Sequence, residues 1–350
     1  MHQRMKHTPE YKALPAKVAQ WVLKQLDHNW KSFFAAIQVW RDDASHFRGR
    51  PKPPRYLNKQ GRNLLIYTLP AISRVGVRTG LIQPSGISIE VKTQHKDIQQ
   101  VRIVPKVTHY VVEVIYEQSV VLKSLDQTLV AGIDIGLDNL AALTSNKPGF
   151  VPVLINGRPL KAINQFYNKR KAHLQSKLID RYTSRQLEQL IDKRNRRVSN
   201  YLHCASRMII NRLVQDGIGT LILGKNHGWK QRINLGKRTN QQFVAVPHTR
   251  FVDMLRYKAE LAGIMVIITE ESYTSKCSFL DAEPIDKADT YEGKRIKRGL
   301  FRSASGKLIN ADCNGSYNII RKVVPNAFGN GIAGVVVHPT RIALTNRSVA

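Results

Sequence analysis

The sequence predicts a mixed α/β domain from residue 126 onward, preceded by a small β-barrel and an N-terminal helical segment. The α/β assignment comes from short apolar strands that alternate with amphipathic helices. The barrel is predicted from short alternating stretches separated by Gly and Pro, and the helical segment from apolar residues at steps of three and four. A chain of 350 residues is long enough for two or three such units.

The first predicted element is a helix that opens at Pro15 and continues to Trp40. We interpret its aromatic side chains as helix core rather than as a platform for stacking bases. The run from Phe47 to Tyr56 breaks the helix with prolines and carries the cations Arg48, Arg50, Lys52 and Arg55. This run fits either an extended strap across a phosphate backbone or a basic linker.

Antiparallel strands of the barrel are predicted at 64–69, 87–91, 101–104 and 110–116. Beyond them, the α/β domain has predicted strands within 129–144, at 220–224 and at 264–271. Long helices are predicted between 158 and 214, and another at 247–261. One face of the long helices is apolar, and the other carries basic residues that include Lys169, Arg170, Lys193, Arg196 and Arg197.

The charge balance predicts a polyanionic partner. Lys and Arg number 55 against 25 Asp and Glu, a formal net charge of +30. Nucleic acid fits this charge better than a membrane surface does, because the cations recur along the whole chain rather than in one cluster. We expect no membrane span and no secretion signal, and therefore a cytoplasmic location. The three cysteines are too few and too scattered for a disulfide framework.

Acidic residues stand at three unusual places in the α/β domain. Asp134 lies within an apolar strand, Glu270 and Glu271 end another strand, and Asp312 stands at the start of a helix. A buried aspartate costs several kcal/mol unless it is compensated, and metal ions are the usual compensation. The glycines on either side of Asp134, Gly132 and Gly136, are expected to leave room for a phosphate and cations. Taken alone, Asp312 could instead act as a helix cap.

Together these acids form the pattern expected of a two-metal nuclease. Its carboxylates hold two divalent ions roughly 4 Å apart, one of which activates water while the other stabilises the leaving oxygen. Oxygen ligands favour Mg²⁺ or Mn²⁺. We therefore expect Asp134, Glu271 and Asp312 to be both the catalytic residues and the metal ligands.

Three motifs resemble the RuvC motifs of TnpB, a transposon-encoded family related to type V CRISPR effectors and to Fanzor proteins. They are Gly132-Ile-Asp-Ile-Gly-Leu-Asp-Asn-Leu-Ala141, Tyr273-Thr-Ser-Lys-Cys277 and Asn310-Ala-Asp-Cys-Asn-Gly-Ser-Tyr-Asn-Ile319. The resemblance implies an RNase H-like (RuvC) nuclease domain, a wedge-type barrel and a helical recognition segment. It also implies a guide RNA made from the transposon end, cleavage of double-stranded DNA next to a short transposon-adjacent motif, and a bacterial, nucleoid-associated protein.

On this basis we assign residues 1–60 to the recognition segment, 61–125 to the wedge-like barrel and 126–325 to the nuclease domain. Residues 326–350 form a C-terminal tail. The chain starts inside the recognition helices of the family pattern, so the first wedge strands are expected to be missing. Further basic residues expected to bind nucleic acid are Lys225, Lys230, Lys276 and Arg298.

The sequence departs from the family at the middle catalytic acid. Family members usually carry this glutamate just after the strand that here reads Leu221-Ile-Leu-Gly-Lys-Asn226, which contains no acid. Some members have it before the Thr-Ser motif instead, at the position of Glu271. We favour Glu271 in a rearranged site, with Glu270 as the alternative, because the two side chains point to opposite faces of an ideal strand.

A second departure concerns zinc. The family commonly has a four-cysteine ribbon between the Thr-Ser motif and the last aspartate, whereas here the insert at about 276–309 contains Cys277 and no further cysteine. Zinc is therefore not expected. Two functions remain open: an RNA-guided endonuclease, or an RNA-guided DNA-binding protein with an impaired metal site. A Glu271 carboxylate facing away from both aspartates would favour the second.

Overall fold

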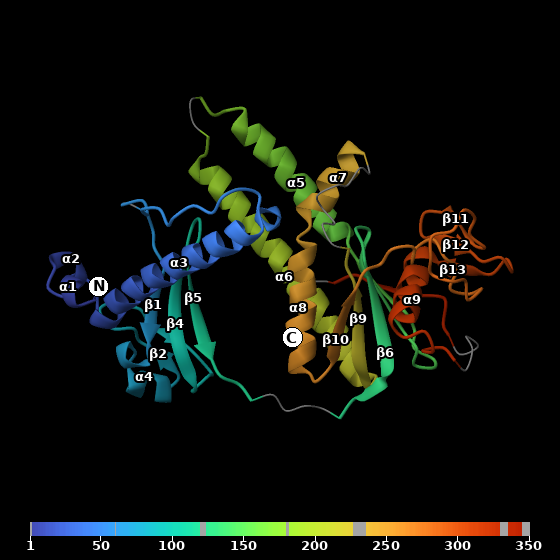
Figure 1. The fold of residues 1–350 in the computed structure, drawn as a ribbon, viewed down its shortest axis with the longest axis horizontal. Coiled ribbons are helices and arrows are strands. Elements are labelled where there is room, and N and C mark those ends of the chain that lie inside the picture. The colour runs from blue at the N-terminus through green and yellow to red at the C-terminus, as the bar shows by residue number, and fades with distance from the viewer. Residues whose placement is uncertain are drawn as a thin grey trace. The chain divides into compact units, whose positions relative to one another are not determined.

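The computed structural model describes residues 2–59, 61–119, 124–179, 182–226, 236–329 and 335–344. The chain divides into two compact units, Met1–Ser119 and Val120–Ala350, each of which has its own core. Among the residues described, no helix is both long enough and apolar enough to cross a lipid bilayer. The ribbon of both units is shown in Figure 1.

The N-terminal unit combines one long helix with two small sheets. Val18 of the helix packs with Tyr67 and Val101 of the larger sheet in a shared core. The helices are α1 (His2–Met5), α2 (Pro9–Lys12), α3 (Ala16–Asp42) and α4 (Arg74–Arg78), with single 3₁₀ turns at Ala44–His46 and Leu69–Ala71. The larger sheet has the order β1 (Leu65–Thr68), β4 (Ile98–Pro105), β5 (Tyr110–Tyr116), and β2 (Leu81–Ile82) pairs with β3 (Val91–Lys92).

Both sheets are antiparallel, as the sequence predicts. The predicted stretch 87–91 is the exception, because only Val91 of it belongs to a strand. In the described part of this unit no ladder joins the two sheets, so closure into a wedge-like barrel stays a prediction.

The interpretation of the aromatic side chains of α3 as helix core is wrong. Only Val18 and Ala19 of this helix are buried, whereas Trp30 is 37% and Phe34 is 60% exposed. The reason is one of length: α3 has 27 residues and spans roughly 40 Å, but the sheet beside it is built of much shorter strands. Beyond its first turns the aromatic rings contact one another, with Trp30 stacked on Phe34 at 5.7 Å between ring centroids.

The C-terminal unit is built on a six-stranded mixed sheet, which confirms the α/β assignment. Its order is β10 (Met265–Thr269), β9 (Ile218–Gly224), β6 (Asp126–Ile135), β7 (Asn139–Ser145), β8 (Val153–Asn156) and β14 (Thr340–Ile342). Strands β10, β9 and β6 run parallel, and β7 runs antiparallel to its two neighbours. The carboxyl ends of the three parallel strands therefore lie at one edge of the sheet.

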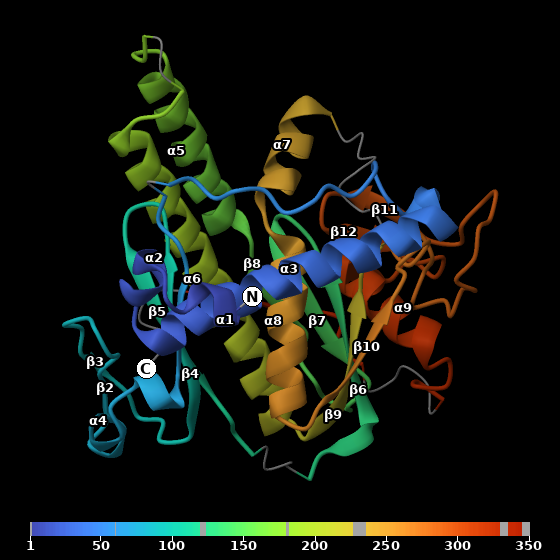
Figure 2. The same ribbon diagram turned by 60° about the vertical axis from the view of Figure 1, so that its left-hand side comes forward.

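Helices cover both faces of this sheet (Figures 1 and 2). On one face, α6 and α8 bury Leu202 and Leu255 with Ile133 and Leu223 of the strands. On the other face, α9 buries Tyr317 against apolar strand residues. The helices are α5 (Arg158–Gln175), α6 (Arg185–Gln215), α7 (Lys237–Ala245), α8 (His248–Leu261) and α9 (Ala311–Val323).

An insert connects β10 to α9. Its regular part is a small antiparallel sheet of β11 (Lys294–Lys297), β12 (Leu300–Arg302) and β13 (Leu308–Asn310). Phe301 and Ile309 of this sheet join the core beneath α9. The insert is thereby anchored to the same helix that carries Asp312.

Candidate active site

Three acidic residues lie at the edge of the sheet where the parallel strands end. Asp134 is the next-to-last residue of β6, Glu271 lies two residues beyond β10, and Asp312 is the second residue of α9. Burial raises the pKa of Asp134 well above its ordinary value, and the negative charges of Glu271 and Asp312 raise it further. The structure therefore brings Glu271 and Asp312 within electrostatic reach of Asp134.

Glu271 is held with one oxygen paired and the other unpaired. Its Oε1 accepts a hydrogen bond of 3.2 Å from Asn226 Nδ2, while its Oε2 is buried without a hydrogen-bond partner in the described structure. Burial raises the pKa of Glu271 to about 7, against the opposing charge of Lys322. Leaving a buried carboxylate oxygen unpaired is costly, so this atom has the character of a ligand for a cation.

Glu270, the alternative middle acid, has a different environment. It is exposed, and its carboxylate accepts a hydrogen bond of 2.7 Å from the Ser272 hydroxyl. The negative charge of Glu271, and not that of Glu270, acts on the pKa of Asp134.

Asp312 is not the cap of its helix, contrary to one interpretation of the sequence. Asn310 is the cap, because its Oδ1 accepts hydrogen bonds from the backbone N–H groups of Asp312 and Cys313. The Asp312 carboxylate instead accepts a 2.6 Å hydrogen bond from Asn139 Nδ2 and lies 3.5 Å from the Arg295 guanidinium. Its carboxylate is therefore not used to cap the helix, and the helix N-terminus favours its negative charge.

Missing side chains make room for the acids. A Cβ atom at Gly315 would lie 2.9 Å from Asp134 Oδ2, and one at Gly224 would lie 2.7 Å from Glu271 Oε2. At Gly132 a Cβ atom would lie 2.6 Å from the Ser316 carbonyl oxygen. The expectation that Gly132 leaves room for a phosphate is therefore wrong, because the α9 backbone fills that space.

The Thr-Ser motif is fixed to α9 by two asparagines. Asn318 Nδ2 donates to the carbonyl oxygens of Thr274 and Cys277, and Asn314 Nδ2 also donates to that of Cys277. Within the motif, Tyr273 has a left-handed backbone with φ of 67°. These asparagines, like Asn139 and Asn226, are not among the predicted site residues, although all four lie within or beside the quoted motifs.

Positive side chains border the acids on the side of the insert. Arg298 forms an ion pair with Asp138, which Lys161 also contacts at 2.7 Å. A cavity of about 260 Å³ lies beside Asp312 in this region. Its charged and amide lining residues are Asp138, Asn139, Arg158, Arg295, Arg298, Asn310, Asp312 and Arg341.

The predicted nucleic-acid-binding residues lie in several places. Arg48, Arg50, Lys52 and Arg55 are exposed in the extended segment after α3, and Lys169 and Arg170 are exposed on α5. Lys193, Arg196 and Arg197 of α6 line a cavity of about 750 Å³. Lys225 follows β9, Lys276 lies over the Tyr291 ring, and Arg298 pairs with Asp138. Lys230 lies outside the described residues.

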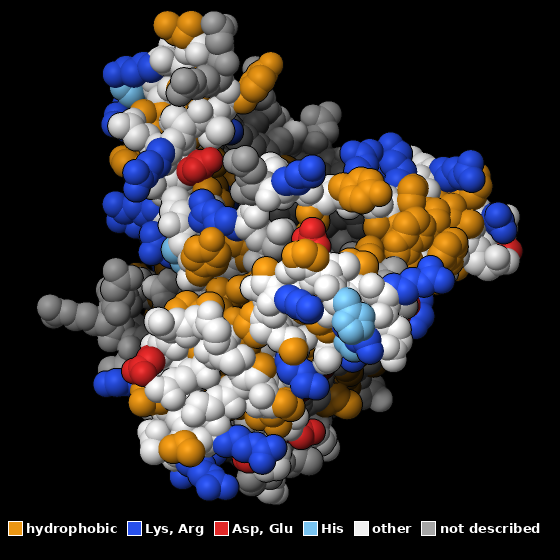
Figure 3. Space-filling view, turned by 90° about the vertical axis from the view of Figure 1, so that its left-hand side faces the viewer, with side chains coloured by type: hydrophobic (Ala, Val, Ile, Leu, Met, Phe, Trp, Pro, Cys, Tyr) orange, Lys and Arg blue, Asp and Glu red, His pale blue; other side chains and the backbone are white. Residues whose placement is uncertain are grey.

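Basic side chains are widespread at the surface, and acidic ones are sparse on the face shown in Figure 3. Among the predicted nucleic-acid-binding residues, Lys193, Arg196 and Arg197 of α6 form the clearest cluster, because all three line one cavity. Arg196 also pairs with Asp192 at 3.1 Å, which orients its guanidinium on the helix.

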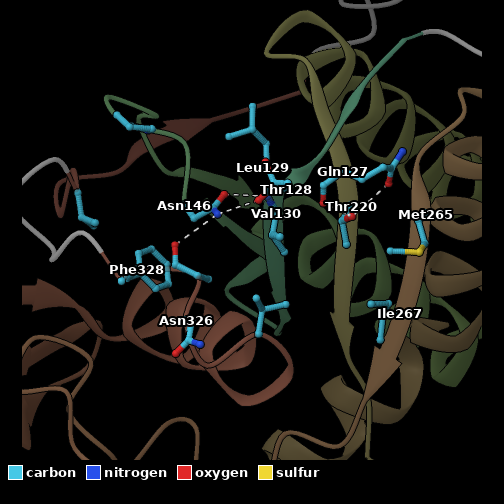
Figure 4. Close-up of a pocket in the computed structure, with 15 residues that line it drawn as sticks. Gln127, Thr128, Leu129, Val130, Asn146, Thr220, Met265, Ile267, Asn326 and Phe328 are labelled. Atoms are coloured by element: carbon cyan, nitrogen blue, oxygen red, sulfur yellow. Dashed lines mark hydrogen bonds between the residues drawn. The ribbon is translucent and has the colours of Figure 1, made fainter.

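A further cavity, of about 630 Å³, lies at the opposite edge of the sheet (Figure 4). It is lined by Thr128, Thr220 and Met265, which lie near the amino ends of β6, β9 and β10. The acids lie at the carboxyl ends of the same strands, so this cavity is not part of the candidate active site.

The donors at the acid site suit a hard divalent cation. Within the described ranges no three His, Cys, Asp or Glu side chains come close enough together to hold a metal ion. The chemistry of the donors fits Mg²⁺ or Mn²⁺ all the same, because carboxylate oxygens are their preferred ligands and Glu271 Oε2 is buried without a partner.

Comparison with known proteins decides the family. A model described as a probable transposase, OrfB_IS605, matches residues 109–230, and the Cas12f1-like TNB domain model matches residues 248–319. The chain belongs to the TnpB family. The two matched ranges contain the three residues Asp134, Glu271 and Asp312.

Two curated relatives support this TnpB assignment. The TnpB-like protein ORF457 of Acidianus two-tailed virus is 25% identical over 228 residues, covering 62% of this chain and 44% of the relative. The CRISPR-associated endodeoxyribonuclease Cas12f2 of a Micrarchaeota archaeon is 27% identical over 208 residues, covering 56% and 37%. This TnpB family member thus matches less than half the length of either relative.

Two solved structures are similar to parts of this TnpB family member. The Cas12f1–sgRNA–target DNA complex matches with a TM-score of 0.44 and 17% identity, covering 63% of this chain and 55% of that one. A CRISPR-Cas12f ternary complex matches with a TM-score of 0.43 and 15% identity, covering 63% and 45%.

Proposed function

We propose that this chain is an RNA-guided DNA endonuclease of an insertion sequence, with an RNase H-like (RuvC) domain that cuts DNA next to a short transposon-adjacent motif. The observation that carries the proposal is the position of Asp134, Glu271 and Asp312 at the carboxyl ends of β6 and β10 and at the start of α9. It is supported by a curated relative that is named a CRISPR-associated endodeoxyribonuclease.

The reaction is hydrolysis of a phosphodiester bond. Asp134, Glu271 and Asp312 would hold Mg²⁺ or Mn²⁺, which when bound supplies the positive charge that activates water and stabilises the leaving oxygen. The chain itself orients the carboxylates: Asn226 donates a hydrogen bond to Glu271, and Asn139 donates one to Asp312. Arg295 and Arg298 provide positive charge on the insert side, where a DNA backbone can approach.

The basic surfaces bind a guide RNA made from the transposon end and the target double-stranded DNA. Such binding acts through the phosphate backbone, so that the choice of sequence is left to base pairing. Lys193, Arg196 and Arg197 are the residues that we place first in this role, because they line one cavity. Residues 1–60 and 61–125 serve in this proposal as the recognition segment and the wedge.

A second candidate function is an RNA-guided DNA-binding protein with an impaired metal site. It is favoured by one observation, the absence of a metal-sized cluster among the described His, Cys, Asp and Glu residues. In this alternative the Arg295 guanidinium beside Asp312 serves as a permanent counter-charge.

The experiment that tests the proposal compares four single variants in a guided cleavage assay with the RNA that copurifies with the protein. We expect Asp134→Asn, Glu271→Gln and Asp312→Asn each to abolish cleavage while leaving RNA and DNA binding nearly unchanged, because such carboxylates act as a unit. Glu270→Gln, the matched control, should retain cleavage because Glu270 is exposed. Full activity of Glu271→Gln would refute the rearranged site, and inactivity of the unmutated protein would favour the binding protein.

A further inference from the structure

We propose that Asn226 is a positioning residue that holds the Glu271 carboxylate in the space left by the missing side chain of Gly224, so that the unpartnered Oε2 could bind a divalent cation. This inference rests on the proposed function, since it assumes that Glu271 is a metal ligand. It adds that this ligand is oriented by the end of the neighbouring strand.

The strand register brings the two side chains together. β9 and β10 are parallel neighbours whose last residues, Gly224 and Thr269, are paired. The backbone N–H of Lys225 donates to the Thr269 carbonyl at 2.8 Å and extends this pairing by one residue. Asn226 and Glu271 each lie two residues beyond the end of their strand, so they face each other across this extension.

Asn226 binds Glu271 twice. Its Nδ2 donates to Glu271 Oε1 at 3.2 Å, and its Oδ1 accepts from the Glu271 backbone N–H at 3.0 Å. One amide side chain therefore fixes both the backbone and the carboxylate of the same glutamate. The bond to Oε1 limits rotation of the carboxylate group, and the bond from the backbone N–H holds the Asn226 amide in place to make it.

Gly224 gives the carboxylate its place. A Cβ atom at Gly224 would lie 2.7 Å from Glu271 Oε2 and 3.4 Å from Glu271 Cβ, so the glutamate side chain lies directly over this glycine. The space is closed on another side by Ile319 of α9, whose Cδ1 lies 2.7 Å from the same position. The glutamate thus fills the volume that a side chain at position 224 would occupy.

The Glu271 carboxylate therefore has one hydrogen-bonded oxygen and one oxygen without a hydrogen-bond partner. Oε1 is bound to Asn226, and Oε2 is buried with no partner among the described residues. This arrangement does not serve stability, because an unpaired buried oxygen raises the free energy of the folded state. It does serve metal binding, for which residues behind a ligand commonly contribute 10- to 100-fold in affinity.

The test measures Mn²⁺ binding to the full-length chain without nucleic acid, by calorimetry, alongside thermal unfolding. We expect Asn226→Ala to weaken Mn²⁺ binding by about 10- to 100-fold. Asn200→Ala, an exposed amide on α6, is the matched control and should leave binding unchanged. Raising the Mn²⁺ concentration should restore guided cleavage in Asn226→Ala but not in Glu271→Gln.

A double variant separates a positioning role from a merely structural one. If Asn226 acts through Glu271, then adding Asn226→Ala to Glu271→Gln should weaken Mn²⁺ binding no further. An equal loss in both backgrounds, or unchanged Mn²⁺ binding in Asn226→Ala, would overturn the inference. If Glu271→Gln itself changes neither Mn²⁺ binding nor cleavage, the proposed function fails instead.

Discussion

At the scale of single residues, Glu283 shows how the insert keeps its shape. This carboxylate is only 5% exposed, and each of its oxygens accepts a backbone hydrogen bond: Oε2 from Ser278 at 2.6 Å and Oε1 from Glu292 at 3.0 Å. Arg321 of α9 donates to the carbonyl oxygens of Glu283 and Ala282. The side chain therefore joins two separate parts of the insert to each other and, through Arg321, to α9.

We expect Glu283→Gln to destabilise the C-terminal unit by about 1.5–3 kcal/mol, because an amide NH₂ would face a backbone N–H donor and a charged acceptor would be lost. Urea unfolding followed by far-UV circular dichroism measures this change in the free energy of unfolding. Glu292→Gln is the matched control, since its side chain is exposed on the same insert, and it should cost no more than about 0.5 kcal/mol.

We expect the structure of the insert to be independent of zinc. If the Glu283 carboxylate holds the insert together, a zinc-selective chelator should leave both unfolding and guided cleavage unchanged. A loss of structure on selective zinc removal would contradict this role of Glu283.

At the scale of secondary structure, the sequence predicts elements better than it predicts what covers them. The helix in 16–42 and the buried strand at 220–224 follow from apolar spacing alone. The same spacing places the α3 aromatic residues on a shared face, but it does not tell whether any partner lies there, and Phe34 is exposed. Periodicity describes one element, whereas burial depends on a second.

The candidate site divides in the same way. Asp134 and the acids at 270 and 271 could be singled out because carboxylates in apolar strands or at their ends are unusual, and Asp312 because it stands at the start of a helix. The choice of Glu271 over Glu270 rests on the resemblance to the family. Asn226 could not, because its role depends on the register between β9 and β10, which no pattern within one strand specifies. Gly224 could not be predicted either, since only the packed structure shows what fills the space above a glycine.

The contact between α6 and α8 contains a buried cation. Lys258 of α8 is 4% exposed, and its Nζ donates to the Ser206 hydroxyl at 2.7 Å and to the His203 carbonyl at 2.9 Å. Burial lowers the pKa of Lys258 from 10.5 to about 8, and the positive charge of Arg207 acts in the same direction, against the opposing effect of Cys204. The folded state therefore disfavours the protonated form of this lysine.

Because of Lys258, we expect the free energy of unfolding to increase between pH 8 and about 10. In that window the unfolded chain keeps the Lys258 proton while the folded chain has lost it, so raising the pH favours folding. Below pH 8 both states are protonated, and the cost of burying the charge is present in full. Lys258→Met should lose this increase while other groups titrate as before; urea unfolding at several pH values in both proteins measures it, and equal slopes would contradict it.

At the scale of the whole molecule, the net charge of +30 and the sparse acidic residues of the face in Figure 3 indicate binding through phosphates. Total charge and a specific surface make different predictions, however. If binding followed total charge, any three cations would contribute alike. If the cavity lined by Lys193, Arg196 and Arg197 holds the backbone of a nucleic acid, these three should contribute more than others.

The salt dependence of RNA binding distinguishes the two. We expect affinity for a defined RNA hairpin to fall steeply with salt, and simultaneous Lys193→Gln, Arg196→Gln and Arg197→Gln changes to reduce the slope of log K against log salt by roughly 2 to 3. A control variant with Arg256, Lys287 and Lys307 changed to Gln loses the same formal charge, but at positions outside this cavity: Arg256 pairs with Glu260, and the two lysines are exposed on the insert. Its slope should stay close to that of the unmutated protein, because counterion release counts phosphates contacted rather than charges carried. Equal reductions in the two variants would show that total charge, and not the α6 cavity, governs the binding of RNA.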